Sequence, residues 1–77
     1  MDGKSWEIKC PTSGKMDKIR RNISGALKQS QNIIIGTFNT DIPDDKIIRY
    51  CQKYSTINKS IKKLIVITKH KQIIDIK

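Results

Sequence analysis

The residues of this chain whose types and spacing could do chemistry lie near its start, in Trp6-Glu7-Ile8-Lys9. In an extended strand, alternate side chains point to opposite faces, so Glu7 and Lys9 share one face and Trp6 and Ile8 the other. A carboxylate can move a proton or hold a metal, and an ammonium group can stabilise negative charge developing on a phosphodiester. The pair therefore suits cleavage of a nucleic-acid backbone. A surface ion pair of small energy is the alternative interpretation.

Charge narrows the class of partner. The 77 residues include 16 Lys and Arg against 7 Asp and Glu, a formal net charge of +9, which favours a polyanion such as RNA, DNA or an anionic membrane surface. The length allows one domain, residues 1–77, with one small core. The longest apolar runs, Ile33–Ile35 and Leu64–Ile67, fall far short of the roughly 20 residues of a membrane-spanning helix, and no signal peptide is visible.

The thiols and the imidazole do not form a metal pattern. Cys10, Cys51 and His70 lack the spacing of a zinc site, and two cysteines are too few for a disulfide scaffold. We predict reduced structural thiols, with no metal and no cofactor. His70 falls in a predicted turn, where a spectator role is favoured over general-base catalysis.

The pattern of apolar residues predicts six elements in the order strand, helix, strand, helix, strand, strand. Three- and four-residue spacing predicts an amphipathic helix whose apolar stripe is Met16, Ile19, Ile23, Ala26 and Leu27. Gly25 inside this helix costs about 1 kcal/mol relative to Ala. Close packing of a neighbour is the favoured reason for it, and close approach of a ligand is the alternative.

The later elements predict a small mixed sheet. The run Ile33–Ile35 is apolar on both faces and so predicts a central strand, and a second helix begins near Pro43. The strand Leu64–Thr68 should lie parallel to the Ile33–Ile35 strand, with Ile73–Ile76 as an antiparallel edge strand. The fold class is therefore α+β, with two helices on a mixed sheet.

This arrangement predicts where the chemistry sits. If both helices cover one face of the sheet, the other face is free to bind RNA, and we expect Glu7 and Lys9 there because Trp6 and Ile8 take the core. The loop residues Thr12, Ser13 and Lys15 add hydroxyls, a cation and backbone N–H groups that suit phosphate.

Further candidates come from the first helix and from the end of a strand. Arg20 flanks the apolar stripe and is a better candidate for the RNA-binding rim than Arg21 or Lys28, which lie opposite it. Thr68 and Lys69 follow a buried strand, and strand ends commonly line sites in such sheets.

Three stretches of the sequence resemble a known family. The patterns D-G-K-x-W-E-x-K-x-P, I-R-x-N-I-x-x-A-L-K-Q-S-x-N-I-I-I and L-I-V-I-T-K-x-x-x-I-I-D are similar to the C-terminal tRNA nuclease domains of bacterial contact-dependent growth-inhibition and polymorphic toxins. The resemblance covers nearly the whole chain. It implies a barnase, colicin and RelE-like ribonuclease architecture, and an enzyme that cleaves tRNA without a metal.

The resemblance also implies roles for single residues. By position it gives catalytic roles to Glu7, Lys9 and Thr68. It gives RNA-binding roles to Lys15, Arg20, Asn22, Lys28 and Gln29. A cognate immunity protein is implied, as are delivery within a larger secreted toxin and action in the cytoplasm of a target cell.

The chain departs from the family at three points. Cys10 replaces a small polar residue, and Lys69-His70-Lys71 lacks the Gly expected in that hairpin. Family members carry a further helix and a first strand before the W-E-x-K strand, so we expect an N-terminally truncated domain.

Two other hypotheses about the function stay open. Glu7-x-Lys9 also fits a Mg²⁺-dependent, restriction-like nuclease, which needs a second carboxylate on a neighbouring strand; neither Asp2 nor Asp75 is a convincing partner. The other reading is a non-catalytic, basic RNA- or protein-binding remnant that forms a homodimer through an exposed strand edge.

Overall fold

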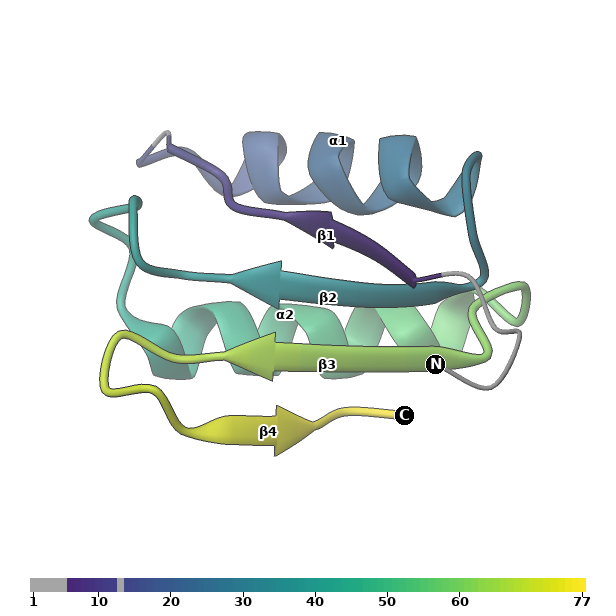
Figure 1. The fold of residues 1–77 in the computed structure, drawn as a ribbon. Coiled ribbons are helices and arrows are strands. Elements are labelled where there is room, and N and C mark those ends of the chain that lie inside the picture. The colour runs from purple at the N-terminus through teal and green to yellow at the C-terminus, as the bar shows by residue number, and fades with distance from the viewer. Residues whose placement is uncertain (1–5, 13) are drawn as a thin grey trace.

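The computed structural model describes residues 6–12 and 14–77. Along this part of the chain, the elements follow the predicted order of strand, helix, strand, helix, strand, strand (Figure 1). Their bounds are β1 Trp6–Lys9, α1 Met16–Leu27, β2 Asn32–Gly36, α2 Asp44–Ile57, β3 Lys63–Ile67 and β4 Ile73–Asp75. The predicted α+β class is thereby confirmed.

The four strands form one mixed sheet in the order β1-β2-β3-β4. Strands β1, β2 and β3 are mutually parallel, because a helix connects each to the next, and β4 returns antiparallel to β3 through a short turn. The predictions that β2 is central and that the closing hairpin lies at the edge are both confirmed.

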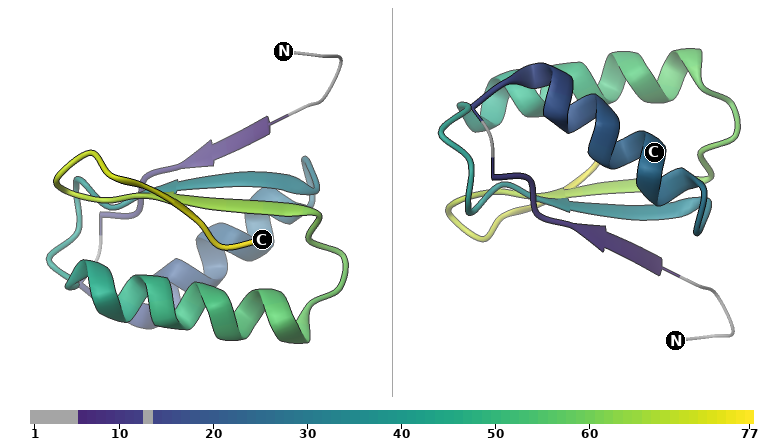
Figure 2. Two further views of the ribbon diagram at one scale, coloured as in Figure 1. Left: turned by 90° about the horizontal axis from the view of Figure 1, so that it is seen from below. Right: turned by 90° about the horizontal axis from the view of Figure 1, so that it is seen from above.

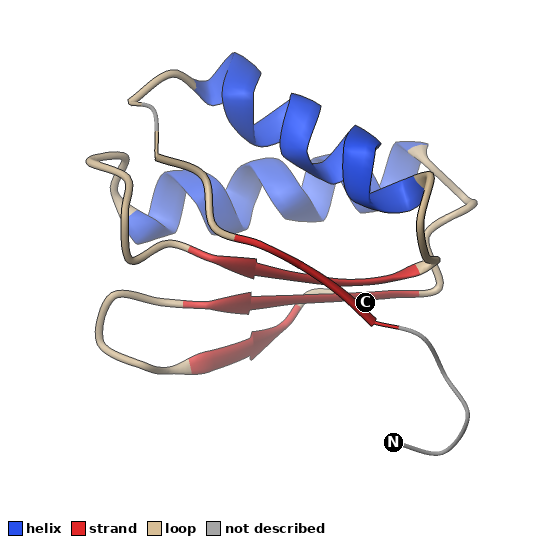
Figure 3. Ribbon diagram, turned by 45° about the horizontal axis from the view of Figure 1, so that its top comes forward, coloured by secondary structure: helices blue, strands red, loops and turns tan. Residues whose placement is uncertain are grey.

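Both helices lie on the same face of the sheet, and no described helix covers the other face (Figures 2 and 3). The core fills the space between these two layers. Its fully buried members come from both helices and from β2, β3 and the loop before β3, and they include Ile19, Ile23, Ala26, Ile33, Ile35, Ile47, Cys51, Ile61, Leu64 and Val66. Burial of each large aliphatic side chain contributes about 1.5–3 kcal/mol, so this layer is the main source of stability.

The pairing of β1 with β2 corrects the predicted orientation of the first strand. In the parallel register, Glu7 lies beside Ile33 and Lys9 beside Ile35. Residues paired across neighbouring strands point to the same face, and Ile33 and Ile35 are fully buried under the helices. Glu7 and Lys9 therefore lie on the helix-covered side, and the prediction that they occupy the open face is wrong.

The residues predicted to anchor the core from β1 lie on the open face instead. Trp6 is half-buried there and Ile8 is 60% exposed. Alternation along a strand separates two sets of side chains without saying which set faces the core. At the edge strand β1, the open face takes the apolar set because the middle of that face is itself apolar.

The open face carries apolar side chains along all four strands. The strand register places there the half-buried Ile34, Ile65 and Ile67, together with the exposed Ile8 and Ile73. No helix of the described chain is long and apolar enough to cross a membrane. Both cysteines are free thiols, as predicted, with Cys51 in the core and Cys10 exposed.

Candidate nucleic-acid interface

The first helix has a polar face that borders the edge strand. Lys18, Arg21, Asn22 and Gly25 recur at intervals of three, one and three residues, so they lie on one side of α1. Together with Lys9 of β1 they line a groove of about 240 Å³. This set, Lys9, Lys18, Arg21, Asn22 and Gly25, is called the β1–α1 groove below.

The β1–α1 groove is cationic. Arg21 Nε lies 3.1 Å from Asp17 Oδ2, which offsets part of its charge. Neither Lys9 nor Lys18 takes part in any of the ion pairs formed within residues 6–12 and 14–77. Two ammonium groups and one guanidinium therefore border a hollow that suits phosphate oxygens.

Glu7 lies on the same strand face as Lys9, two residues earlier. Two residues of a strand span about 6.6 Å, so the carboxylate follows the ammonium group along the edge of the groove. Glu7 forms no ion pair within the described chain, so the alternative of a Glu7–Lys9 surface ion pair is not realised. This geometry leaves the carboxylate available to accept a proton.

The base of the groove is open at Gly25. A Cβ atom built at Gly25 would meet no heavy atom within 4 Å, so the prediction that close packing requires this glycine is wrong. Nearby, Asn22 Nδ2 donates a hydrogen bond to the Lys18 carbonyl, 2.7 Å away, which holds that amide against the helix. The glycine and the folded-back amide both leave room for a ligand to approach α1.

The structure places Arg21, and not the favoured candidate Arg20, at the β1–α1 groove. Arg20 lines a different hollow, beside Tyr50 and Tyr54 of α2, and its Nη2 lies 2.9 Å from Asp17 Oδ1. The hydrogen bond from Arg20 lowers the pKa of Asp17. Arg21 borders the β1–α1 groove instead. Helical spacing puts Arg21 opposite the apolar stripe, and the sequence does not say which side of α1 lies next to β1.

Other predicted RNA-binding residues are spread over the molecule. Thr12 and Lys15 are exposed in the connection between β1 and α1, and Ser13 lies outside the described residues. Lys28 and Gln29 lie at the far end of α1, in a separate hollow of about 710 Å³. Of the predicted RNA-binding residues that the structure describes, Asn22 alone lines the β1–α1 groove, where it joins the predicted catalytic residue Lys9.

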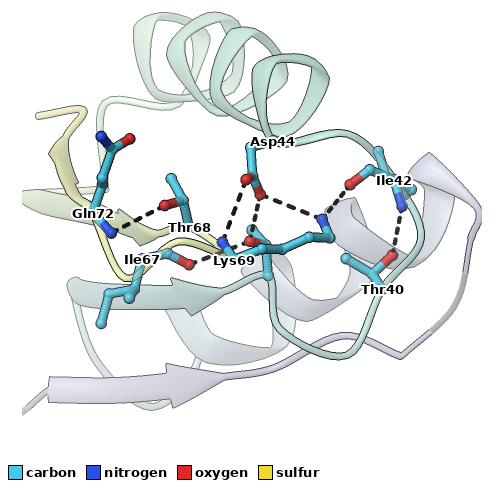
Figure 4. Close-up of polar contacts among 8 residues, drawn as sticks. Thr40, Ile42, Asp44, Ile67, Thr68, Lys69 and Gln72 are labelled. Atoms are coloured by element: carbon cyan, nitrogen blue, oxygen red, sulfur yellow. Dashed lines mark hydrogen bonds and ion pairs between the residues drawn. The ribbon is translucent and has the colours of Figure 1, made fainter.

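Lys69 forms part of a polar cluster where β3 ends. Its Nζ donates a hydrogen bond to the Ile42 carbonyl at 2.6 Å and lies 3.3 Å from Asp44 Oδ1 (Figure 4). Thr37 Oγ1 also donates to Asp44 Oδ1, at 2.6 Å. Partial burial acts to raise the pKa of Asp44, but the hydrogen bonds from Thr37 and Lys69 outweigh it, so this pKa lies below its ordinary value.

Thr68 closes the turn that follows β3. It is 2% exposed, and its Oγ1 accepts a hydrogen bond from the Gln72 N–H at 3.0 Å. Strand β2 separates β3 from β1, so the structure does not bring Thr68 or Lys69 next to Glu7 and Lys9. Their contacts account for a structural role, and their catalytic and RNA-binding roles stay predictions. His70 is exposed in the same turn.

The described residues contain no cluster of three or more His, Cys, Asp or Glu side chains able to hold a metal ion. Asp75 of β4 pairs with Ile65 of β3, so it lies on the open face of the sheet, opposite the face that bears Glu7. Asp2 lies outside the described residues. Glu7 is therefore the one carboxylate that the described chain places on this face of β1.

The chain is thus a small, basic α+β domain with a cationic groove between β1 and α1. Residues 1–73 match the family model of the contact-dependent growth inhibition CdiA C-terminal domain. The chain belongs to this family of toxin domains, and the predicted resemblance is confirmed.

A solved structure has a similar fold. The chain is similar to the CdiA-CT/CdiI toxin and immunity complex from Burkholderia pseudomallei, with a TM-score of 0.74 and 24% identity. The match covers 94% of this chain and 55% of the other, so the chain spans about half the length of that relative. A search of curated protein sequences finds no match.

Proposed function

We propose that this toxin domain is a ribonuclease that cleaves tRNA, with the β1–α1 groove as its substrate site. The observation that carries the proposal is the convergence of Lys9 with Lys18 and Arg21 in one groove, on the strand face that also bears Glu7. The net charge of +9 supports a polyanionic substrate.

In the proposed reaction, Glu7 accepts the proton of a ribose 2′-hydroxyl as its oxygen attacks the adjacent phosphorus. The bond from phosphorus to the 5′-oxygen breaks, and that oxygen takes a proton from solvent. Lys9 stabilises the negative charge that builds up on the phosphoryl oxygens. The products are a 2′,3′-cyclic phosphate and a 5′-hydroxyl, and the required 2′-hydroxyl restricts the enzyme to RNA.

The first experiment incubates bulk tRNA with the chain in Mg²⁺ or in EDTA and identifies the product ends. Metal-free cleavage should persist in EDTA, leave 2′,3′-cyclic phosphates, and be lost in Glu7→Ala and Lys9→Ala. The matched controls are Asp41→Ala and Lys53→Ala, which remove the same charges from exposed positions outside the groove. Equal losses in the controls would contradict the assigned roles.

The same assay separates the metal-dependent alternative. A Mg²⁺-dependent nuclease would leave 3′-hydroxyl or 3′-phosphate ends produced by attack of water, and EDTA would abolish cleavage. We favour the metal-free reaction because Glu7 is the one carboxylate of β1 and none of the described residues that line the groove is acidic, whereas the metal route needs a second carboxylate beside Glu7. Cleavage with Mg²⁺ alone would overturn that preference.

We also propose that a cognate immunity protein blocks this chain. The similar toxin from Burkholderia pseudomallei was solved as a toxin and immunity complex. The charge of this chain favours an acidic contact surface on such a partner. Delivery would occur within a larger secreted toxin, with action in the target-cell cytoplasm. Cytoplasmic expression should therefore stop growth, and Glu7→Ala should relieve the arrest.

A second candidate function is a non-catalytic RNA- or protein-binding domain that dimerises. The observation that favours it is the outer edge of β1, which pairs with no other described strand and carries the 60% exposed Ile8. Light scattering over a range of dilutions tests this. A dimer, combined with tRNA that stays intact in both Mg²⁺ and EDTA, would support this candidate over the nuclease.

A further inference from the structure

A second basic hollow lies at the C-terminal end of α1, beyond the β1–α1 groove. It has a volume of about 710 Å³ and is lined by residues 27–32 and 62–63. Three of these residues are lysines, Lys28, Lys62 and Lys63, and none is acidic. Within residues 6–12 and 14–77, no ion pair involves any of the three. Their positive charge is therefore not offset locally.

The backbone holds the lysines in place on both sides of this hollow. The N–H groups of Lys62 and Lys63 donate to the Gln31 carbonyl, at 2.9 and 3.2 Å. Lys28 is the C-terminal cap of α1. A cation at a helix C-terminus is favourable by itself, which explains Lys28 but not the two lysines opposite it.

The hollow continues the polar face that borders the β1–α1 groove. Lys18, Arg21, Gly25 and Lys28 follow one another at intervals of three or four residues along one side of α1. Ten residues of helix span about 15 Å, which corresponds to roughly four nucleotide steps at about 3.4 Å each. One RNA can therefore contact both ends of this face.

We propose that Lys28, Lys62 and Lys63 form a second phosphate-binding site, which holds the substrate RNA about 15 Å along α1 from Lys18 of the β1–α1 groove. The proposal rests on the proposed ribonuclease function for the identity of the ligand. Such contacts position an RNA without reading its bases, so this site adds affinity for a long substrate and no sequence preference.

The test measures binding of fluorescein-labelled bulk tRNA to Lys62→Gln/Lys63→Gln over a range of salt concentrations. The matched control is Lys53→Gln/Lys59→Gln, which removes two exposed lysines outside both basic hollows. Loss of two phosphate contacts should reduce the slope of log affinity against log salt by about 1.4–1.8, since each contact contributes about 0.7–0.9. The control pair should change the slope by much less.

A three-nucleotide RNA serves as a second probe, because its two nucleotide steps span about 7 Å at about 3.4 Å each and are too short to reach both ends of the face. Its affinity should be the same for the wild-type chain and Lys62→Gln/Lys63→Gln. Equal slopes for the two double variants on tRNA would overturn the proposal. If the wild-type chain leaves tRNA intact but the slopes differ as expected, the nuclease function fails while the second RNA site stands.

Discussion

Replacement of Gly25 by larger residues is the sharpest test of the β1–α1 groove, because stability and RNA binding should change in opposite directions. Gly25 lies in the last turn of α1, and an added Cβ would meet nothing within 4 Å. Gly is about 0.8–1.0 kcal/mol less favourable than Ala inside a helix. With no clash to offset that gain, Gly25→Ala should stabilise the fold by about 0.5–1 kcal/mol, the lower figure allowing for fraying of the last turn.

The expected gain is measurable by thermal unfolding. For a chain of this size, about 1 kcal/mol corresponds to roughly 4–8 °C in Tm. Gly25→Leu should be about as stable, since Leu is a strong helix former and its Cβ would meet no heavy atom within 4 Å. The affinity for tRNA should fall in the order Gly25, Ala, Leu, because each larger side chain fills more of the groove.

Ser24→Ala is the matched control for helix propensity. Ser24 does not line the groove, so this substitution should raise the stability of α1 without weakening RNA binding. A Gly25→Ala chain that is less stable than wild type would refute the open geometry at this position. Undiminished tRNA binding by a folded Gly25→Leu chain would show that RNA does not pass through the groove.

Three further predictions concern stability and reactivity. The pKa of Asp44 in the folded state is below its ordinary value of 3.8, so the stability that its carboxylate contributes is present above that pH and is lost as pH falls through the folded pKa. Asp44→Asn should therefore lower the free energy of unfolding by about 1–3 kcal/mol at pH 7 and flatten the fall in Tm below pH 4. The control Asp45→Asn should do neither. Lys71 has a positive φ of 63°, so Lys71→Gly should raise stability by about 0.5–1 kcal/mol in urea unfolding, and a loss would contradict that conformation. Burial raises the pKa of the Cys51 thiol to about 12, so a thiol reagent at pH 8 should modify Cys10 alone until denaturant is added.

Much of the fold could be predicted from local patterns. The three- and four-residue spacing of Ile19, Ile23 and Ala26 reports a helix face directly, because a helix turns about 100° per residue whatever surrounds it. The β-branched runs of β2 and β3 likewise mark buried strands, and a helix between two strands favours parallel pairing. The sequence lacks the glycine expected in the hairpin around Lys71, and the structure shows that Lys71 itself has the positive φ that a glycine adopts more easily.

The site depended on information that local patterns do not contain. Alternation in β1 grouped Glu7 with Lys9, but only the register against β2 showed that this pair lies on the helix side. Helical spacing placed Arg20 beside the apolar stripe and Arg21 opposite it, but the packing of α1 near β1 brings Arg21 to the groove.

The second basic hollow shows the same limit over a longer distance in the sequence. Lys28 and Lys63 are far apart along the chain, and strand pairing of β2 with β3 brings them to one end of the sheet. Charge and family membership could be predicted from the residues alone, because each depends on composition or on contiguous motifs. Which cations share a groove depends on contacts between distant segments, and these exist only once the chain has folded.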